Sequence, residues 1–221
     1  LRSMKTHGVT RISINPQSMK EHTLELLGRK HTVEEIREKF MLARTLGFDN
    51  INMDLIAGLP EETLEDFKET LREVEALKPD SITVHTLVIK RASRLRKEQL
   101  EQGGEMREED ACIEPMQKEA EQFCRVHGYE PYYMYRQKNK AHTTRNTNQE
   151  NVAYAKPGKE CLYNIFIMEE LQSILALGSG GSSKIVFPEE NRMERVENVK
   201  SVDDYIGRID EMIRRKKESW R

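Results

Sequence analysis

The sequence predicts an α/β protein with a parallel sheet, because strand-like and helix-like segments alternate through the first 90 residues. The strand-like segments cover residues 9–15, 51–56 and 80–86, and helices that begin after Thr32 and Thr63 separate them. Strands joined by helices of this length form βαβ units, in which the strands run parallel. Within each strand, polar and apolar side chains alternate, so each strand has one apolar and one polar face.

The polar face of these strands predicts an open or partial barrel rather than a closed one. Parallel strands buried on both faces read as continuous apolar runs, and a closed eight-stranded barrel fills its interior with branched apolar side chains. We expect the helices to cover the apolar face and the polar face to surround a polar ligand. An antiparallel sheet with one wet face is the alternative, but the helical crossovers argue against it. The apolar set is Ile12, Ile14, Ile51, Met53, Leu55, Ile82 and Val84, and the polar set is Arg11, Ser13, Asn15, Asn52, Asp54, Ser81, Thr83 and His85.

Capping residues, glycine and proline mark the helix boundaries. Thr32 and Glu35 form a capping box before one helix, and Gly47 follows its end. Thr63 caps the next helix, which Pro79 ends. Both helices carry apolar stripes that can pack on the sheet. These are Val33, Ile36, Phe40 and Ala43 in the first helix and Leu64, Phe67, Leu71, Val74 and Leu77 in the second.

The composition argues against several classes of partner. The chain has 221 residues, of which 36 are basic and 38 acidic, and a net charge of −2, which predicts no general affinity for nucleic acid or an anionic membrane. No apolar run approaches the roughly 18–20 residues that cross a bilayer, and Leu1 to His7 lack the features of a signal peptide. We therefore expect a cytoplasmic protein. Because the chain starts at Leu1 rather than methionine, we also expect a segment to precede it.

The cysteines do not predict a metal site. Cys112, Cys124 and Cys161 are too far apart in sequence for a metal-ligand pattern. We expect reduced, structural thiols, with a metal or redox role as the alternative.

The chain is expected to divide into three parts. Residues 1–90 form the barrel-like part, residues 91–107 a charged connector, and residues 108–221 a smaller mixed α+β region. The cations around the connector favour a solvated face, and binding of a substrate's carboxylates is the alternative. These cations are Lys90, Arg91, Arg94, Arg96 and Lys97.

In the third part we expect a helix over residues 108–127, an aromatic strand over 131–136 and a polar, irregular stretch over 138–160. Ser201 and Asp204 predict the start of a last helix, with an apolar stripe at Val202, Ile206, Ile209 and Ile213. The glycine-rich run from Gly178 to Ser183 lacks the Lys-Ser/Thr ending of a phosphate-binding loop. It therefore favours a tight turn that brings backbone close to a ligand or a strand.

Four side chains are candidates for one ligand-binding rim. Asp54 and His85 lie near the carboxyl ends of adjacent strands on the same polar face, where parallel α/β folds bind ligands. Gln17 follows the first strand and Arg29 precedes the first helix. An acid, a guanidinium and an amide suit a zwitterionic ligand with an amino group, a carboxylate and ribose hydroxyls. Each residue taken alone is better explained as a surface or network residue, but the coincidence of four on one rim favours a binding site.

Several motifs resemble those of the oxygen-independent coproporphyrinogen III oxidase family of radical S-adenosylmethionine (radical SAM) enzymes. The strand Arg11-Ile-Ser-Ile-Asn-Pro-Gln17-Ser18 resembles its "R-I-S-x-G-x-Q-S" segment, and Leu27-Gly-Arg29-Lys-His31 its next one. Asn52-Met-Asp54-Leu-Ile-Ala-Gly58-Leu-Pro60 is similar to its most specific motif, "N-x-D-L-I-x-G-L-P". Further similar segments follow in the family's order, and the resemblance covers about residues 8–184. These segments are 83–87, 132–139, 150–154 and 177–182.

The resemblance implies a partial (βα)6 radical SAM barrel, of which this chain holds the C-terminal half. It implies SAM and a [4Fe–4S] cluster as cofactors, with Gln17, Arg29 and Asp54 holding SAM and His85 beside it. The implied activity is oxidative decarboxylation of two propionates of coproporphyrinogen III to vinyl groups by a 5′-deoxyadenosyl radical in haem biosynthesis. The implied partners are a tetrapyrrole substrate and an electron donor, with neither nucleic acid nor membrane.

The chain departs from the family pattern in ways that qualify this expectation. The three-cysteine cluster motif is absent, so the cluster ligands lie outside this chain, and the chain alone is expected to be inactive, with no catalytic or metal-ligating residue of its own. Asn15-Pro16 replaces the usual pair before Gln17, and His85 stands where many members have an aromatic residue. The strand over 9–15 is expected to be an exposed edge through which the chain self-associates. The alternatives are a haem or porphyrin carrier and a different radical SAM activity.

Overall fold

The computed structural model describes residues 1–87, 108–136 and 150–220 in two compact units. The first unit is Leu1–Glu160 and the second is Cys161–Arg221. The expected connector, residues 91–107, lies outside the described residues. The boundary between the two units lies between Glu160 and Cys161, within the region 108–221 that the sequence assigned to one part. Within the described residues, no helix is both long and apolar enough to cross a membrane.

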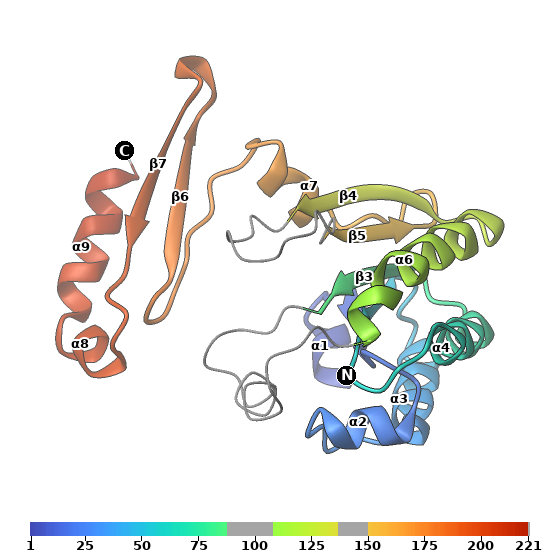
Figure 1. The fold of residues 1–221 in the computed structure, drawn as a ribbon. Coiled ribbons are helices and arrows are strands. Elements are labelled where there is room, and N and C mark those ends of the chain that lie inside the picture. Colours follow the sequence, from blue (N-terminus) through green and yellow to red (C-terminus); the bar gives the residue numbers. More distant parts are fainter. Residues whose placement is uncertain (88–107, 137–149, 221) are drawn as a thin grey trace. The chain divides into compact units, whose positions relative to one another are not determined.

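The first unit is built on one open five-stranded sheet in the order β1-β2-β3-β5-β4 (Figure 1). Strands β1, β2 and β3 run parallel, whereas β5 is antiparallel to both β3 and β4. The predicted α/β fold with parallel strands and an unclosed sheet is confirmed. The strands are β1 (Ile12–Ser13), β2 (Ile51–Ala57), β3 (Ser81–Thr86), β4 (Glu130–Arg136) and β5 (Glu150–Ala155).

The helices of this unit start where their capping residues predict. Helix α3 (Val33–Thr45) begins after Thr32, whose hydroxyl accepts a hydrogen bond from the Glu35 N–H (3.1 Å) while the Glu35 carboxylate accepts one from the Thr32 N–H (2.9 Å). Helix α4 (Leu64–Leu77) has the same reciprocal box between Thr63 and Asp66. The other helices are α1 (Arg2–Thr6), α2 (Glu21–Leu26) and α6 (Glu108–Val126).

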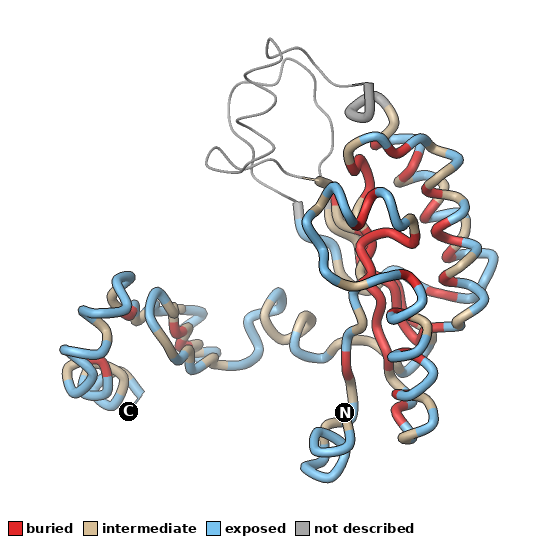
Figure 2. The backbone as a smooth tube through the Cα atoms, turned by 90° about the horizontal axis from the view of Figure 1, so that it is seen from below, coloured by how far each residue is buried: buried red, intermediate tan, exposed pale blue. Residues whose placement is uncertain are grey.

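The apolar faces of the strands and helices form one core. Figure 2 shows the buried residues concentrated on the strands and on the sides of the helices that face them. The predicted apolar strand residues are buried, except Ile14, which is partly buried, and α3, α4 and α6 cover them. From the helices, the core includes Ile36, Phe40, Phe67, Leu71, Val74, Met116, Ala120 and Cys124.

The first strand is shorter than predicted. The expected strand over residues 9–15 is reduced to Ile12–Ser13, followed by a single parallel bridge between Gln17 and Leu55. Pro16 has no N–H to donate and interrupts the ladder between these points. Strand β1 is at an edge of the sheet, and self-association through it stays a prediction.

The stretch expected to be polar and irregular contains a strand inside the sheet, so that expectation was wrong for residues 150–155. β5 lies between β3 and β4, with Ala153 opposite Thr83 and Tyr154 opposite Ile82. Ala153 and Ala155 are almost fully buried in this inner strand. The residues before this strand are mainly charged or carry amides, so the sequence pattern did not indicate its short apolar segment as a strand.

The second unit is a β-hairpin with short helices. Its elements are α7 (Leu162–Met168), β6 (Ser182–Phe187), the 3₁₀ turn η1 (Pro188–Glu190), β7 (Arg192–Glu197), α8 (Val202–Gly207) and α9 (Ile209–Ser219). The glycine-rich run forms a turn that bonds to the chain after β7: the Gly180 N–H donates to the Val199 carbonyl (2.7 Å), and the Asn198 N–H donates to Gly181 (2.8 Å).

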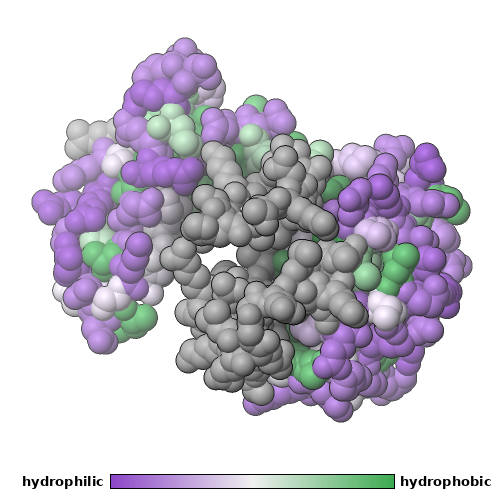
Figure 3. Space-filling view, in the orientation of Figure 1, coloured by the Kyte–Doolittle hydropathy of each residue, from purple (hydrophilic) through white to green (hydrophobic). Residues whose placement is uncertain are grey.

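The predicted last helix is broken at Arg208 into α8 and α9. Its expected apolar stripe is exposed, and Met212 is the buried residue of α9 instead. On the face drawn in Figure 3, the coloured residues are mainly hydrophilic, with apolar side chains in small separate groups. This agrees with a chain in which one third of the residues are charged.

Candidate functional site

Asp54 and His85 come together on the polar face of the sheet, as the sequence predicts. The register pairs Asp54 with Thr83 and Ile56 with His85, so Asp54 and His85 are diagonal neighbours on adjacent parallel strands. The His85 Nε2 lies 3.8 Å from the Asp54 Oδ2. Both side chains keep access to solvent, with 35% of the His85 side chain and 21% of the Asp54 side chain exposed. A ligand can therefore reach an acid and an imidazole at one point.

Asn52 fixes the Asp54 carboxylate. Its Nδ2 donates to the Asp54 Oδ1 (2.6 Å) and to the Ser13 hydroxyl (3.3 Å). Its Oδ1 accepts from the hydroxyls of Ser81 (3.0 Å) and Thr83 (3.1 Å). A carboxylate only accepts hydrogen bonds, so the amide nitrogen must face Asp54. All four hydrogen-bonding positions of this buried amide are filled.

The network continues to Arg11, whose Nη2 donates to the Ser81 hydroxyl (3.0 Å). Sequence analysis placed Arg11, Asn52, Ser81 and Thr83 on the polar face but did not single them out as site residues. The signal that could have found them is the two-residue alternation from Asn52 to Asp54 and from Ser81 through Thr83 to His85.

Opposing influences act on the pKa of Asp54. Burial is the largest and raises the pKa. Hydrogen bonding and positive charge from His85, with hydrogen bonds from Asn52 and Thr83, outweigh burial, so the pKa of Asp54 lies below its ordinary value. Asp54 is therefore an anion at neutral pH and can bind an ammonium group or accept hydrogen bonds from hydroxyls.

Gln17 is joined to the same strand through its backbone. Its N–H donates to the Asp54 carbonyl and its carbonyl accepts from the Ile56 N–H, both at 3.0 Å. Its φ is +69°, a left-handed conformation that is unusual for a residue other than glycine. Gln17 is 9% exposed, and its side-chain amide donates a long hydrogen bond to the Asn15 carbonyl (3.4 Å).

The structure places Arg29 in the loop between α2 and α3, with its side chain exposed. Among the described residues, no hydrogen bond or ion pair joins Arg29 to Gln17, Asp54 or His85. The structure therefore brings the side chains of Asp54 and His85 together and places the Gln17 backbone beside Asp54, whereas Arg29 stays in the loop.

The donors and acceptors present fit SAM but not an iron–sulfur cluster. An anionic carboxylate, an imidazole and an amide match the ammonium, hydroxyl and carboxylate groups of SAM. In contrast, no three His, Cys, Asp or Glu side chains of the described residues are placed to hold a metal ion. Cys124 is buried in the core and burial raises its pKa to about 12, which disfavours the thiolate that metal binding needs.

The chain is similar in sequence to known proteins. The sequence profile of the Radical SAM superfamily matches residues 1–74. The chain is 44% identical over 207 residues to the oxygen-independent coproporphyrinogen-III oxidase-like protein HemZ of Bacillus subtilis, covering 94% of this chain and 40% of that protein. It is 29% identical over 182 residues to the heme chaperone HemW of Escherichia coli, covering 82% of this chain and 42% of that protein.

A solved structure shows the same fold. The match to coproporphyrinogen III oxidase (HemN) from Escherichia coli, described as a radical SAM enzyme, has a TM-score of 0.65 at 20% sequence identity. It covers 94% of this chain and 45% of that chain. This chain thus spans about two fifths of the length of the relatives that it matches.

The parallel strands, their polar face and the superfamily profile define a radical SAM protein. Within that superfamily, the chain is similar to oxygen-independent coproporphyrinogen III oxidase and its relatives. Radical SAM proteins in general use SAM and a [4Fe–4S] cluster.

Proposed function

We propose that this chain is part of an oxygen-independent coproporphyrinogen III oxidase, which converts two propionates of coproporphyrinogen III to vinyl groups in haem biosynthesis. Each conversion removes carbon dioxide and one hydrogen, a two-electron oxidation. Residues 1–90 would form the C-terminal half of the barrel and residues 108–221 the substrate side. Because no cluster site is present in the described residues, we propose that this chain is inactive by itself.

The observation that carries the proposal is the polar group formed by Asn52, Asp54, Thr83 and His85 on one face of β2 and β3, in which His85 is one residue before the carboxyl end of β3. It combines an anion whose pKa is lowered with a partly exposed imidazole, and the imidazole lies toward the carboxyl edge of the sheet, where α/β proteins bind ligands. We assign Asp54 to the ammonium group or ribose hydroxyls of SAM, Gln17 and Arg29 to its polar groups, and His85 to a place beside it.

When SAM is bound and reductively cleaved, it supplies the 5′-deoxyadenosyl radical that removes hydrogen from the substrate. The residues of this chain orient SAM and provide electrostatic complementarity. Asp54 attracts the cationic ligand, and Asn52 keeps the Asp54 carboxylate in one orientation.

The test uses the full-length protein reconstituted anaerobically with iron and sulfide, then incubated with SAM, a reductant and coproporphyrinogen III. Mass spectrometry should detect 5′-deoxyadenosine together with protoporphyrinogen IX, and both should fall when Asp54 is replaced by alanine. Deoxyadenosine without decarboxylated product would retain radical chemistry and remove this substrate.

A second candidate is haem carriage, which the similarity to the heme chaperone HemW over 82% of this chain favours. A carrier would bind haem in a stoichiometric ratio without SAM. Absorbance titration of the full-length protein with haem separates the two functions, because tight haem binding without deoxyadenosine formation would replace the oxidase proposal.

A further inference from the structure

A buried carboxyl group lies next to the turn that carries Gln17. Glu62, in the loop between β2 and α4, is 3% exposed, and Ser18, the residue after Gln17, is 1% exposed. The Ser18 hydroxyl donates a hydrogen bond to the Glu62 Oε1. The Lys20 N–H in turn donates to the Ser18 oxygen (3.2 Å). Ser18 thus links the Glu62 carboxyl group to the backbone of the turn at Lys20.

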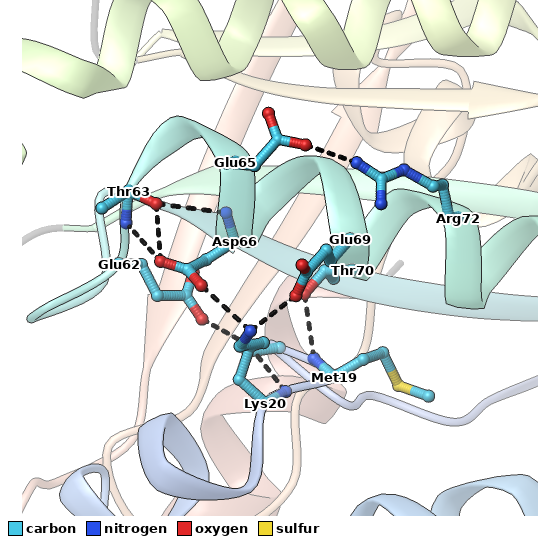
Figure 4. A network of polar contacts seen from close by, with 10 residues as sticks. Met19, Lys20, Glu62, Thr63, Glu65, Asp66, Glu69, Thr70 and Arg72 are labelled. Atoms are coloured by element: carbon cyan, nitrogen blue, oxygen red, sulfur yellow. Dashed lines mark hydrogen bonds and ion pairs between the residues drawn. The ribbon is translucent and has the colours of Figure 1, made fainter.

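The environment of Glu62 differs from that of an ordinary ion pair. In Figure 4 the nearby Lys20 ammonium points to Asp66 (3.0 Å) and Glu69 (2.6 Å) on α4. Burial raises the pKa of Glu62, and hydrogen bonds from the hydroxyls of Ser18 and Thr23 only partly oppose this effect. A carboxyl group buried in this way is costly unless its hydrogen bonds are made. Its two hydroxyl partners therefore have to stay in place, and one of them belongs to the turn.

The turn itself needs support from outside. Gln17 has a left-handed backbone, which is held in folded proteins only where the surroundings fix it. On one side, the Gln17 backbone is bonded to Asp54 and Ile56 of β2. On the other side, the Met19 N–H donates to the Thr70 hydroxyl on α4 (3.2 Å), and Ser18 is bonded to Glu62. The position of Gln17 relative to Asp54 thus depends on contacts from both sides.

We propose that Glu62 is a positioning residue for the SAM site: by binding Ser18, it holds the left-handed turn that carries Gln17 beside Asp54. This proposal rests on the proposed function, since it assigns Gln17 to SAM. It accounts for a buried titratable group that the proposed chemistry does not use.

The test compares variants of the full-length, cluster-loaded protein by equilibrium binding of SAM and by amide hydrogen exchange of residues 17–20. Glu62→Leu should weaken SAM binding by about tenfold and speed exchange in this turn, because it leaves Ser18 without its acceptor. Glu62→Gln, which keeps an acceptor oxygen, should restore both values to within about twofold of the wild type. Ser18→Ala should resemble Glu62→Leu, and the double variant should be no worse than either single one.

Glu65→Gln, on the exposed face of α4 where Glu65 pairs with Arg72, is the matched control and should leave SAM binding unchanged. Unchanged SAM affinity in a folded Glu62→Leu protein would overturn the proposal, as would failure of Glu62→Gln to restore it. If Glu62→Leu does not fold, the Ser18→Ala variant decides by the same two readouts. If the wild-type protein does not bind SAM at all, the proposed function fails first.

Discussion

At position 52 the fold requires a side chain that accepts two hydrogen bonds and donates two. The Asn52 oxygen accepts from Ser81 and Thr83, and its nitrogen donates to Ser13 and Asp54. An aspartate has the same shape but cannot donate when ionised. The hydrogen bond that the side-chain amide donates to the Asp54 carboxylate therefore explains the asparagine of the Asn52-x-Asp54 motif.

We expect Asn52→Asp to raise the pKa of Asp54, because two carboxylates would lie where a 2.6 Å hydrogen bond now joins Asn52 and Asp54. The free energy of unfolding at neutral pH should fall by about 1–3 kcal/mol. Urea denaturation and an NMR titration of the Asp54 carboxyl group measure the two effects. The same change at Asn191, in an exposed turn of the second unit, is the control and should have little effect. An unchanged Asp54 pKa would show that the Asn52 bond does not matter.

The lowered pKa of Asp54 predicts a pH dependence of stability. Because the folded pKa lies below the unfolded value of about 3.9, the contribution of Asp54 is complete above that value and is lost as the pH falls through the folded pKa. Asp54→Asn removes this contribution. The difference in unfolding free energy between wild type and variant should therefore shrink as the pH falls below the unfolded pKa of about 3.9. A difference that stays constant as the pH falls below the unfolded pKa would contradict the assignment.

Thiol reactivity distinguishes the three cysteines. Cys124 is fully buried and its pKa is raised to about 12, whereas Cys112 and Cys161 are partly exposed. In the native protein, an aromatic disulfide reagent should modify Cys112 and Cys161 first and Cys124 only after unfolding. Cys124→Ser is the control that identifies the slow thiol, and rapid reaction of Cys124 in the folded protein would contradict its place in the core.

The helices and strands that are marked by residues within their own segment were predicted from the sequence. Those whose structure depends on segments far away in the sequence were not. The capping residues of α3 and α4 and the alternation of β2 and β3 act within a few residues, so the sequence indicates them directly. Strand β5 depends on β3 and β4, which border it on both sides, and its own apolar segment is short. The break at Arg208 and the exposure of the stripe around Ile206 follow from packing in the second unit, where Met212 takes the buried position.

Gly58 shows how one residue lets α6 approach the end of β2. Its φ is +83°, and a Cβ atom would lie 2.6 Å from the Cγ1 of Ile113 on α6. We expect Gly58→Ala to lower the free energy of unfolding by about 2–5 kcal/mol, from backbone strain of about 1–2 kcal/mol and overpacking of about 1–3 kcal/mol. Urea denaturation measures the loss.

Gly128→Ala is the matched control for Gly58→Ala. Its φ is +76° but nothing lies within 4 Å of the added atom, so it should show the strain alone. Ile113→Val in the Gly58→Ala background should recover part of the overpacking loss. Equal losses at both glycines would mean that Ile113 moves aside without cost.

For the whole molecule, the sequence motifs predicted the family and the open sheet, which the relatives and the solved structure confirm. Three of the four candidate residues, Gln17, Asp54 and His85, lie beside one another along β2, because strand register carries them there. Arg29 lies in a loop, and no strand register fixes its side chain. The hydroxyl and amide network behind Asp54 needed the structure, since hydrogen bonds between strands do not follow from sequence order.

The central claim is that the polar group formed by Asn52, Asp54, Thr83 and His85 binds SAM. Equilibrium binding of SAM to the full-length, cluster-loaded protein tests this claim most directly. Asp54→Asn should weaken binding by about tenfold or more, because it removes the anion that faces the ligand. Asp49→Asn, the same change at an exposed residue that pairs with Lys159, should leave the affinity unchanged. If Asp54→Asn binds SAM as tightly as the wild type while remaining folded, SAM binds elsewhere and the account of this site is wrong.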